Sequence, residues 1–310
     1  MGKQKVILMK IGLIGLGRMG GNLTLNLKDH KHEVVVYDRN RENVDFYKEK
    51  GAIPSYSIDE MIKQLESPRI VWVMVTAGAA TNAVIKELTP KLTKGDIIID
   101  GGNTHYKETI KRANDLVAKG LKFLDVGTSG GVSGARNGAC FMVGGDKKSF
   151  KLIEPILKDL SVPNGYGYFG NSGAGHFTKM IHNGIEYGMM QSIGEGMEII
   201  EKSEFSPNLA KLADVWNHGS IIEGFLVKMM KQAYEEDKTL SDYTGEVGLS
   251  GEGEWTLSTA KELHVETPAI QASVDMRKKS KEKKYYQGKV IQALRFKFGG
   301  HTNTDNALKK

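Results

Sequence analysis

The hexapeptide Gly15-Leu16-Gly17-Arg18-Met19-Gly20 carries the strongest indication of fold in this chain. It follows the apolar run Lys10–Ile14, which is typical of a buried strand, and it opens Met19–Asp29, which has the periodicity of a helix. Asp38 ends the next apolar run. A glycine turn between strand and helix, with a carboxylate at the end of the second strand, is the arrangement that binds dinucleotides. On the glycines alone, an ordinary tight turn remains the alternative.

The residues of this turn would hold the cofactor through the backbone. Glycines allow the tight turn and the close approach of a pyrophosphate, and the helix N-terminus offers its N–H groups to the phosphates. Asp38 would accept hydrogen bonds from a ribose diol and repel a 2′-phosphate, whereas Arg39 and Arg41 could hold that phosphate or stack on adenine. We therefore expect NAD as the cofactor, with NADP as the alternative.

The first half alternates strand-like and helix-like segments. Val- and Ile-rich runs without polar alternation indicate strands covered on both faces, hence a mostly parallel sheet. The expected strands are Lys10–Gly15, Glu33–Tyr37, Ile70–Val75, Ile97–Asp100, Lys122–Val126 and Ala139–Val143. The expected helices are Met19–Asp29, Arg41–Lys50, Ile58–Leu65, Ala79–Leu88 and Tyr106–Lys119. After about Gly173 the periodicity becomes helical throughout. We predict a Rossmann-like domain over 1–172 and an all-α domain over 173–310, with the boundary in the glycine-rich stretch Asn164–Gly175.

Composition narrows the class of protein. The chain has 310 residues, 40% of them hydrophobic and 26% charged, as is usual for a soluble protein of two domains. A net charge of +6 favours an anionic small molecule over a nucleic-acid groove. Cys140 is the only cysteine, which excludes an intrachain disulfide and favours a reducing, cytoplasmic compartment. The histidines lack metal-ligand spacing, so no metal is expected.

The N-terminus could be mistaken for a targeting segment. Lys3, Lys5 and the apolar run Val6–Met9 resemble the start of a signal peptide, but Lys10 interrupts the run, which leads directly into the first strand. We expect residues 1–8 to be an extension before that strand, with Met9 as a candidate start. No run approaches the roughly 18 apolar residues that span a bilayer, so no membrane partner is expected.

A polar stripe is predicted on a helix that starts near Gly173. Lys179, His182, Asn183, Glu186 and Tyr187 fall at i, i+3, i+4, i+7 and i+8, on one side of a helix. The side chains expected to bury its other sides are Met180, Ile181, Ile185 and Met189. Such a stripe suits a proton-transfer site or a polyhydroxy ligand. A solvated face is the alternative, although it explains Lys and Glu better than His, Asn and Tyr.

Two further glycine motifs follow predicted strands. Asp100-Gly101-Gly102-Asn103 ends one strand and Ser129-Gly130-Gly131 follows another, both at the edge where ligands bind in open α/β folds. Asn103 offers a donor and an acceptor, and the second motif could hold a carboxylate with backbone N–H groups. Each motif could separately be an ordinary glycine turn.

Together these motifs resemble those of the decarboxylating 6-phosphogluconate dehydrogenases, in a short form with one helical half. The blocks that carry the resemblance are Gly15–Gly20, Ile97–Asn103 (IIIDGGN), Ser129–Arg136 (SGGVSGAR), Gly173–Tyr187 (GAGHFTKMIHNGIEY) and Ile291–His301 (IQALRFKFGGH). They occur in family order from one end of the chain to the other.

The resemblance implies roles for individual residues. Lys179 matches the family's general base, and Glu186 matches the acid that protonates C1 of an enediol intermediate. Positions that match cofactor contacts include Val75, Thr76, Ala77 and Asn103. Positions that match substrate contacts are Asn103, Ser129, Gly130, Gly131, His182, Asn183 and Tyr187. The reaction implied is oxidative decarboxylation of 6-phosphogluconate to ribulose 5-phosphate.

The match to the family pattern is less complete at the residues for the phosphate end of the substrate. Arg277 matches a family phosphate ligand, and Arg295 and His301 match a tail that enters a neighbouring subunit's site, which implies a dimer or tetramer. Where long relatives have a Lys-Gly-Thr, this chain has Ser250, Gly251 and Glu252, so positive charge is lost from that pocket.

Two other functions remain open. One is a related β-hydroxyacid dehydrogenase that acts on a small 3-hydroxy acid without decarboxylation. The other is a nucleic-acid-binding module that uses the basic run Arg277–Lys284, although no aromatic residue interrupts that run and most of it is expected to be a solvated helical face.

Overall fold

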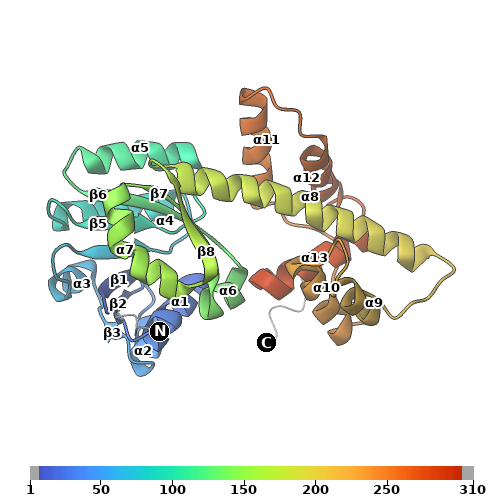
Figure 1. Cartoon of the computed structure of the whole chain (residues 1–310), viewed down its shortest axis with the longest axis horizontal. Coiled ribbons are helices and arrows are strands. Elements are labelled where there is room, and N and C mark those ends of the chain that lie inside the picture. The colour runs from blue at the N-terminus through green and yellow to red at the C-terminus, as the bar shows by residue number, and fades with distance from the viewer. Residues whose placement is uncertain (1–6, 302–310) are drawn as a thin grey trace. The chain divides into compact units, whose positions relative to one another are not determined.

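The computed structural model describes residues 7–301. Residues 1–6 of the expected N-terminal extension lie outside the described residues. The chain divides into two compact units, Met1–Lys179 and Met180–Lys310, which are described separately below. Figure 1 labels the elements of both. Among residues 7–301, no helix combines the length and the apolar character needed to cross a membrane.

Unit 1 is built on one eight-stranded sheet of order β3-β2-β1-β4-β5-β6-β7-β8. Neighbouring strands run parallel except β6 and β7, which are antiparallel. The prediction of a mostly parallel sheet is confirmed. The strands are β1 (Lys10–Ile14), β2 (Glu33–Tyr37), β3 (Ile53–Pro54), β4 (Ile70–Val73), β5 (Ile97–Asp100), β6 (Lys122–Ser129), β7 (Ala139–Gly145) and β8 (Ser161–Gly170).

Helices cover both faces of this sheet (Figure 1). Side chains of α1 and α7 pack on one face and those of α3, α4 and α5 on the other. The helices of unit 1 are α1 (Arg18–Asp29), α2 (Arg41–Glu49), α3 (Ile58–Gln64), α4 (Ala79–Leu88), the 3-10 turn η1 (Thr89–Lys91), α5 (Tyr106–Val117), α6 (Gly131–Asn137) and α7 (Lys147–Leu160).

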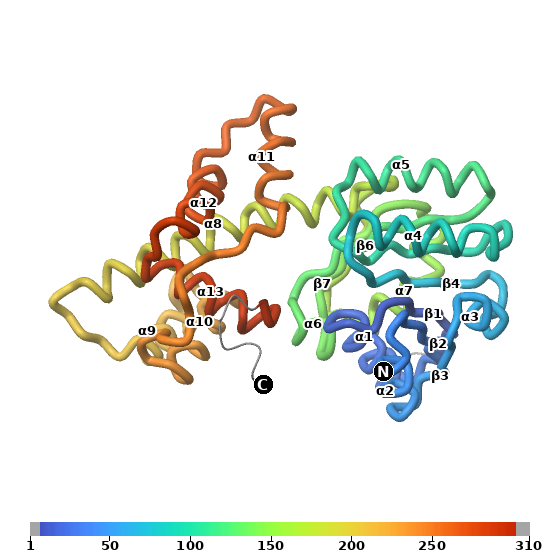
Figure 2. Tube along the Cα trace, turned by 180° about the vertical axis from the view of Figure 1, so that it is seen from behind, coloured from blue at the N-terminus to red at the C-terminus, as the bar shows by residue number. Residues whose placement is uncertain are grey.

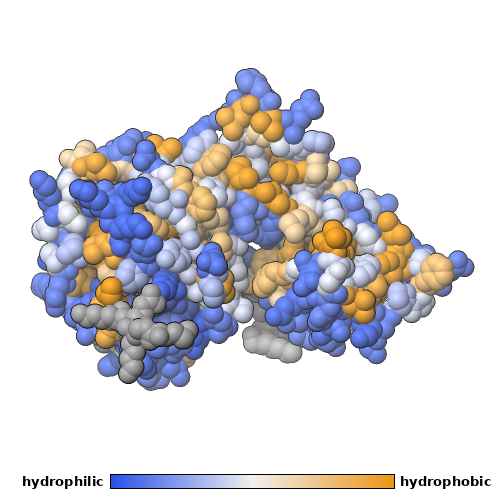
Figure 3. All heavy atoms as spheres, in the orientation of Figure 1, coloured by the Kyte–Doolittle hydropathy of each residue, from blue (hydrophilic) through white to orange (hydrophobic). Residues whose placement is uncertain are grey.

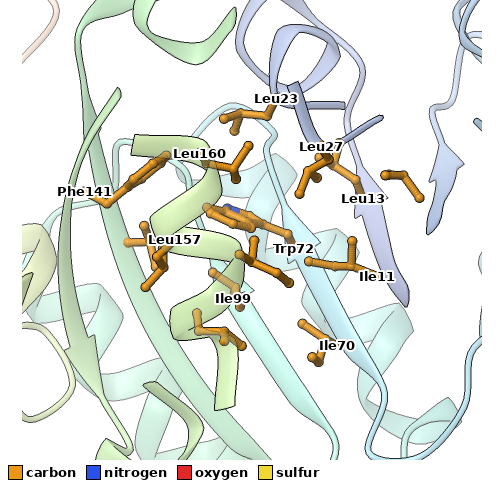
Figure 4. Close-up of a cluster of buried hydrophobic side chains, with 14 of the residues drawn as sticks. Ile11, Leu13, Leu23, Leu27, Ile70, Trp72, Ile99, Phe141, Leu157 and Leu160 are labelled. Atoms are coloured by element: carbon orange, nitrogen blue, oxygen red, sulfur yellow. The ribbon is translucent and has the colours of Figure 1, made fainter. Parts of the chain in front are cut away.

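Figure 4 shows the first of these faces, where Trp72 of β4 lies among leucines of α1 and α7. Trp72, Leu27 and Leu157 are fully buried. Burial of each such leucine is worth about 1.5–3 kcal/mol relative to exposure, so this layer is a main source of the unit's stability. It also fixes the carboxyl ends of the strands, from which the site is built.

Several elements of unit 1 were not predicted, namely β3, η1, α6, α7 and β8. Residues 161–170 form the edge strand β8, although the stretch Asn164–Gly175 was predicted to be a glycine-rich boundary. Its sequence alternates glycine with aromatic residues and has few β-branched side chains, so its strand character depends on pairing with β7. The helix α7 contains Pro155 and was not predicted.

Unit 2 is helical, as expected. Most of α8 (Ala174–Lys202), which begins within unit 1, belongs to it, and Tyr187, Met190 and Met197 of α8 join its core. The helix α10 contacts both α9 and α13, and all three lie in the same part of unit 2 in Figure 2. The remaining helices are α9 (Leu209–Trp216), α10 (Phe225–Glu236), α11 (Glu252–Glu262), α12 (Pro268–Lys279) and α13 (Tyr286–Gly299).

Apolar side chains also reach the surface among hydrophilic ones (Figure 3). In unit 2 they include Ile185 and Met189, which are 53% and 52% exposed. These two residues were expected to bury sides of α8, and that expectation was wrong. Met180 is buried as expected, and Asn183 and Tyr187 make the other buried contacts of this helix. Helical spacing alone does not specify which apolar face is covered.

Candidate active site

The glycine turn joins β1 to α1 as predicted. The N–H of Gly15 donates to the carbonyl of Tyr37 (2.9 Å), and Gly15 has a φ of +96°, which favours glycine. A Cβ on Gly15 would lie 2.5 Å from the carbonyl oxygen of Met74, and one on Gly20 would collide with the carbonyl oxygen of Gly15. The chain's own packing therefore requires glycine at both positions.

Gly17, the N-cap of α1, is different. Its φ of −67° is accessible to any residue, and a Cβ built there would meet no atom within 4 Å. Nothing in the fold therefore requires glycine at this position. The open space lies at the N-terminus of a helix, where backbone N–H groups and the helix dipole favour an anion. The turn fits a pyrophosphate, and this cradle is the feature of the structure that agrees best with a dinucleotide.

Asp38 supports this turn directly. Its Oδ2 accepts a hydrogen bond from the N–H of Leu16 (2.7 Å), and its Oδ1 accepts one from the N–H of Asn40 (2.8 Å). The sequence predicts a cofactor contact for this carboxylate but not its hydrogen bonds to the turn. Since a carboxylate has about four acceptor sites, contact with a ribose is compatible with both bonds. Arg39 and Arg41, the neighbouring cations, are exposed.

The loops after β4 and β5 lie next to each other. The N–H of Gly101 donates to the carbonyl of Val73 (2.9 Å), and a Cβ on Gly102 would lie 3.1 Å from the carbonyl oxygen of Val75. The predicted cofactor loop Val75–Ala77 and the predicted Asp100–Asn103 turn are thus brought together at the carboxyl edge of the sheet. Thr76 is exposed there.

A buried network behind these loops was not predicted. Asp100 is fully buried and accepts from the N–H of Gly102 (3.0 Å) and from the Arg112 guanidinium (2.6 Å). Arg112 of α5 also donates to Asn82 of α4 (2.8 Å). The network holds the Asn103 turn through Gly102. The sequence does not predict this role for Arg112, because the other charged residues of α5 are exposed and Arg112 resembles them.

The Ser129–Gly131 turn follows β6. Gly130 and Gly131 have φ values of +113° and +62°, so the turn depends on glycine. Ser129 pairs with Cys140 across the antiparallel strands β6 and β7. Burial raises the pKa of the Cys140 thiol, and the nearby Lys179 ammonium offsets part of that rise. Lys179 is therefore close to the strand pair that carries Ser129.

The stem of the Lys179 side chain packs against β6 of the sheet. A Cβ on Gly127 of β6 would collide with the Cβ of Lys179, so the absence of a side chain at Gly127 makes room for the lysine stem. Both residues belong to unit 1. The sequence predicts that Lys179 belongs to a polar stripe, but it does not predict the packing of the lysine stem over Gly127.

The remaining residues of the stripe belong to unit 2. Asn183 and Tyr187 are only 8% and 5% exposed, which argues against a solvated face. The Tyr187 hydroxyl lies 3.0 Å from the Ser250 hydroxyl and donates to the Glu252 carboxylate (3.4 Å). The Asn183 amide donates to the other oxygen of Glu252 (3.5 Å). Asn183 and Tyr187 thus form a buried polar surface backed by the start of α11.

The other two residues of the stripe, His182 and Glu186, are half-buried. His182 Nδ1 lies 3.8 Å from a carboxylate oxygen of Glu186, whose side chain is 23% exposed. A carboxylate partly accessible and next to an imidazole can exchange protons with a ligand or with water.

Arg277 is the exception in the basic run. It is 2% exposed, its guanidinium lies 3.3 Å from the centre of the Tyr187 ring, and its Nη1 donates to the carbonyl of Gly248 (3.3 Å). Burial lowers the pKa of Arg277 to about 10, so it stays charged at neutral pH. Its Nη2 is buried, and no atom of residues 7–301 accepts a hydrogen bond from it. The rest of the run is mainly exposed, as expected, although α12 ends at Lys279.

Two predicted substrate residues lie at the end of α13 and beyond it. Arg295 is 9% exposed and is close enough to Arg277 to lower its pKa. His301 is exposed and lies next to Phe298. Among residues 7–301, no group of three or more His, Cys, Asp or Glu side chains is arranged to hold a metal ion.

Comparisons with known proteins cover nearly the whole chain. Residues 10–170 match the family model of the NAD binding domain of 6-phosphogluconate dehydrogenase, and residues 175–294 match that of the 6-phosphogluconate dehydrogenase C-terminal domain. The sequence is 50% identical to YqeC of Bacillus subtilis, provisionally named a 6-phosphogluconate dehydrogenase, over 94% of this chain and 98% of that protein.

Two further relatives carry fuller names. The sequence is 36% identical to the NAD(+)-dependent, decarboxylating 6-phosphogluconate dehydrogenase of Haloferax volcanii, over 94% of this chain and 98% of that protein. The solved 6-phosphogluconate dehydrogenase of Plasmodium falciparum, studied with NADP+ and with 6-phosphogluconate, has a TM-score of 0.81 at 32% identity, over 97% of this chain and 66% of that one. The chain therefore belongs to the 6-phosphogluconate dehydrogenase family.

Proposed function

We propose that the chain oxidises and decarboxylates 6-phospho-D-gluconate to D-ribulose 5-phosphate and carbon dioxide, with NAD as the preferred hydride acceptor. The observation that carries this proposal is the polar stripe of α8, in which Asn183 and Tyr187 remain buried although they are polar. A buried polar surface beside an amine and a carboxylate suits a polyhydroxy acid better than an apolar ligand does.

The bound nicotinamide would supply one chemical capability, acceptance of a hydride from C3 of the substrate. The residues that would hold the cofactor are Gly15, Leu16, Gly17, Arg18, Met19, Gly20, Asp38, Arg39, Val75, Thr76, Ala77 and Asn103. The Asp38 carboxylate supports NAD, since it would repel a 2′-phosphate. The exposed Arg39 could bind the 2′-phosphate of NADP, so NADP is the alternative cofactor. The names of relatives include both cofactors.

Lys179 would act as the general base. It takes the proton of the 3-hydroxyl while hydride leaves C3, which gives a 3-keto acid. The C1–C2 bond then breaks, carbon dioxide leaves, and the electron pair moves into the C3 carbonyl, whose oxygen the Lys179 ammonium polarises. Glu186 donates a proton to the former C2 carbon of the enediol, which becomes C1 of ribulose 5-phosphate.

The residues proposed to bind the substrate are Asn103, Ser129, Gly130, Gly131, His182, Asn183, Tyr187, Arg277, Arg295 and His301. The Arg277 Nη2, which has no hydrogen-bond partner in the described part of the chain, supports an anionic ligand for that guanidinium. Glu252 opposes it, because the carboxylate lies in the same cluster. Arg295 therefore becomes important as a second cation.

We also propose the setting in which the enzyme works. A functional boundary between residues 172 and 173, a cytoplasmic location and a homodimer or homotetramer are consistent with the family. In that assembly the C-terminal tail would complete the neighbouring subunit's site. Neither nucleic acid nor a membrane is a proposed partner.

A comparison of substrates tests the proposal. The purified chain would be assayed by cofactor absorbance with 6-phosphogluconate, with unphosphorylated gluconate and with a small 3-hydroxy acid, each with NAD and NADP. We expect kcat/KM to be highest for 6-phosphogluconate with NAD. A higher kcat/KM for the small acid would favour the non-decarboxylating β-hydroxyacid dehydrogenase instead.

A further inference from the structure

A buried carboxylate in β6 has no part in the chemistry described so far. The Asp125 side chain is fully buried. Its Oδ1 accepts a hydrogen bond from the N–H of Gly173 (2.8 Å), and its Oδ2 accepts one from the N–H of His176 (2.9 Å). A buried carboxylate is unfavourable unless such bonds compensate for lost hydration.

Both donors belong to the beginning of α8, whose first residue is Ala174. The first N–H groups of a helix have no partner within the helix, and a negative charge there also interacts favourably with the helix dipole. Asp125 supplies both interactions from a different element, 48 and 51 residues away in sequence. The start of α8 is therefore fixed to the sheet by one side chain.

Glycines allow the helix to lie directly on the strand backbone. A Cβ on Gly175 would lie 2.5 Å from the carbonyl oxygens of Asp125 and Met142. A Cβ on Gly144 of β7 would lie 2.6 Å from the N–H nitrogen of Gly175. Lys179 follows one turn after Gly175 and lies over Gly127 of the same strand as Asp125. The lysine stem thus has little freedom to move relative to β6.

A third contact joins α8 to α5. His176 is 2% exposed, and its Nδ1 lies 2.8 Å from the hydroxyl of Thr109. The helix that carries Lys179 is therefore held from β6 by Asp125 and from α5 by Thr109.

We propose that Asp125 is a positioning residue for the Lys179 amine: it holds the first turn of α8 so that the amine keeps its place above β6. This inference rests on the proposed function, which assigns the base to Lys179. Displacement of a catalytic group by about 1 Å can cost about 100-fold in rate.

The test compares two carboxylates that each cap a helix of unit 1. Asp125→Asn replaces one acceptor by a donor that faces an N–H, and we expect kcat to fall about 100-fold while the KM for NAD changes less than about twofold. The matched control is Asp146→Asn, since Asp146 caps α7 by accepting from the N–H of Ser149 (2.8 Å). It should leave kcat within about twofold of the unaltered chain. Equal losses of kcat in the two variants would overturn the proposal.

Amide hydrogen exchange gives a readout that does not need turnover. In Asp125→Asn, residues 174–179 should exchange about tenfold faster or more, while Asp146→Asn should leave them unchanged. Unchanged exchange in Asp125→Asn would overturn the inference even if 6-phosphogluconate were not the substrate. Conversely, failure of the unaltered chain to oxidise 6-phosphogluconate would overturn only the proposed function.

If Asp125→Asn does not fold, Thr109→Val tests the same proposal. It removes only the hydroxyl that contacts His176 and keeps the shape of the side chain. We expect faster exchange at residues 174–179 and a kcat lowered about 3-fold to 10-fold. No change in either quantity would contradict the anchoring of α8 as the means of positioning Lys179.

Discussion

The five polar residues of the α8 stripe differ in what holds them. Lys179 rests over Gly127 of β6, whereas Asn183 and Tyr187 share the carboxylate of Glu252. The amine is thus seated by backbone packing, and the amide and phenol are oriented by one buried charge. This arrangement suits a base that must keep its position and polar groups that must keep their orientation.

Replacement of Lys179 tests its proposed role as the general base. Lys179→Met should lower the rate of cofactor reduction by about 100-fold to 10,000-fold, because no other amine takes the 3-hydroxyl proton. The matched control is Lys202→Met on the same helix, whose amine pairs with Glu198 and is 66% exposed. The control should keep its turnover. Near-normal turnover in Lys179→Met would remove the lysine from the chemistry.

Glu186 should act later than Lys179. In Glu186→Gln, stopped-flow absorbance should still show reduction of the cofactor in the first turnover, because the amide cannot donate the proton but does not block hydride transfer. Steady-state formation of ribulose 5-phosphate should fall about 100-fold or more. A first turnover slowed as much as the steady state would assign Glu186 to an earlier step.

The sequence predicts which residues form the site, whereas how those residues are held becomes visible only in the structure. Glycine spacing and an acidic strand end were sufficient to predict the turn at Gly15 and the place of Asp38. The bond from Leu16 to Asp38, the Asp100–Arg112 pair and the Asp125 cap all join residues distant in sequence. A single sequence contains no record of such pairs, because each depends on how the elements pack.

At the scale of elements, the turn between β1 and α1 separates two kinds of glycine. Gly15 and Gly20 are required by the fold, whereas Gly17 faces open space. Gly17→Ala should therefore lower the free energy of unfolding by no more than about 1 kcal/mol, since alanine is a poorer N-cap. It should weaken NAD binding about tenfold or more, because a methyl group would occupy the place of the pyrophosphate.

Calorimetry of NAD binding and denaturant unfolding measure these two effects. Gly15→Ala is the contrast, since its Cβ would approach Met74 and its φ is positive; it should lower stability far more. Unchanged NAD affinity in Gly17→Ala would show that the cofactor does not approach this turn.

His32, which lies just before β2 and contacts Asp159 of α7, should make the free energy of unfolding depend on pH. His32 is fully buried, its Nδ1 accepts from the N–H of Met9 (3.1 Å), and its Nε2 lies 3.1 Å from Asp159. Burial lowers the pKa of His32 below its usual 6.5, although Asp159 opposes this and His30 adds to it. Just below pH 6.5 the unfolded chain therefore binds more protons than the folded one, and stability falls as the pH falls.

Urea unfolding at pH 7.5 and pH 5.5 would measure this effect. The loss of stability on acidification should be smaller in His32→Gln than in the unaltered chain, because the titrating group is gone. It should be larger in Asp159→Asn, which lacks the carboxylate that raises the pKa of His32. An identical loss in all three chains would mean that His32 does not contribute.

At the scale of the whole molecule, the two units were predictable to different degrees. Buried Val and Ile runs predicted the parallel sheet of unit 1, but not β8, whose glycine and aromatic residues become a strand only beside β7. Helical periodicity predicted that unit 2 is helical, but not that Ile185 and Met189 would stay exposed. The spacing of apolar residues indicates whether a segment is a helix or a strand. Which of its faces becomes buried depends on the elements that pack against it.

The central claim is that one chain couples oxidation at C3 to loss of the carboxylate. The most direct measurement supplies 6-phosphogluconate labelled with ¹³C at C1 together with NAD, and follows labelled carbon dioxide and reduced cofactor in the same reaction. We predict equal amounts of the two products, with unlabelled ribulose 5-phosphate remaining. Reduced cofactor without labelled carbon dioxide would contradict the account and identify a dehydrogenase that does not decarboxylate.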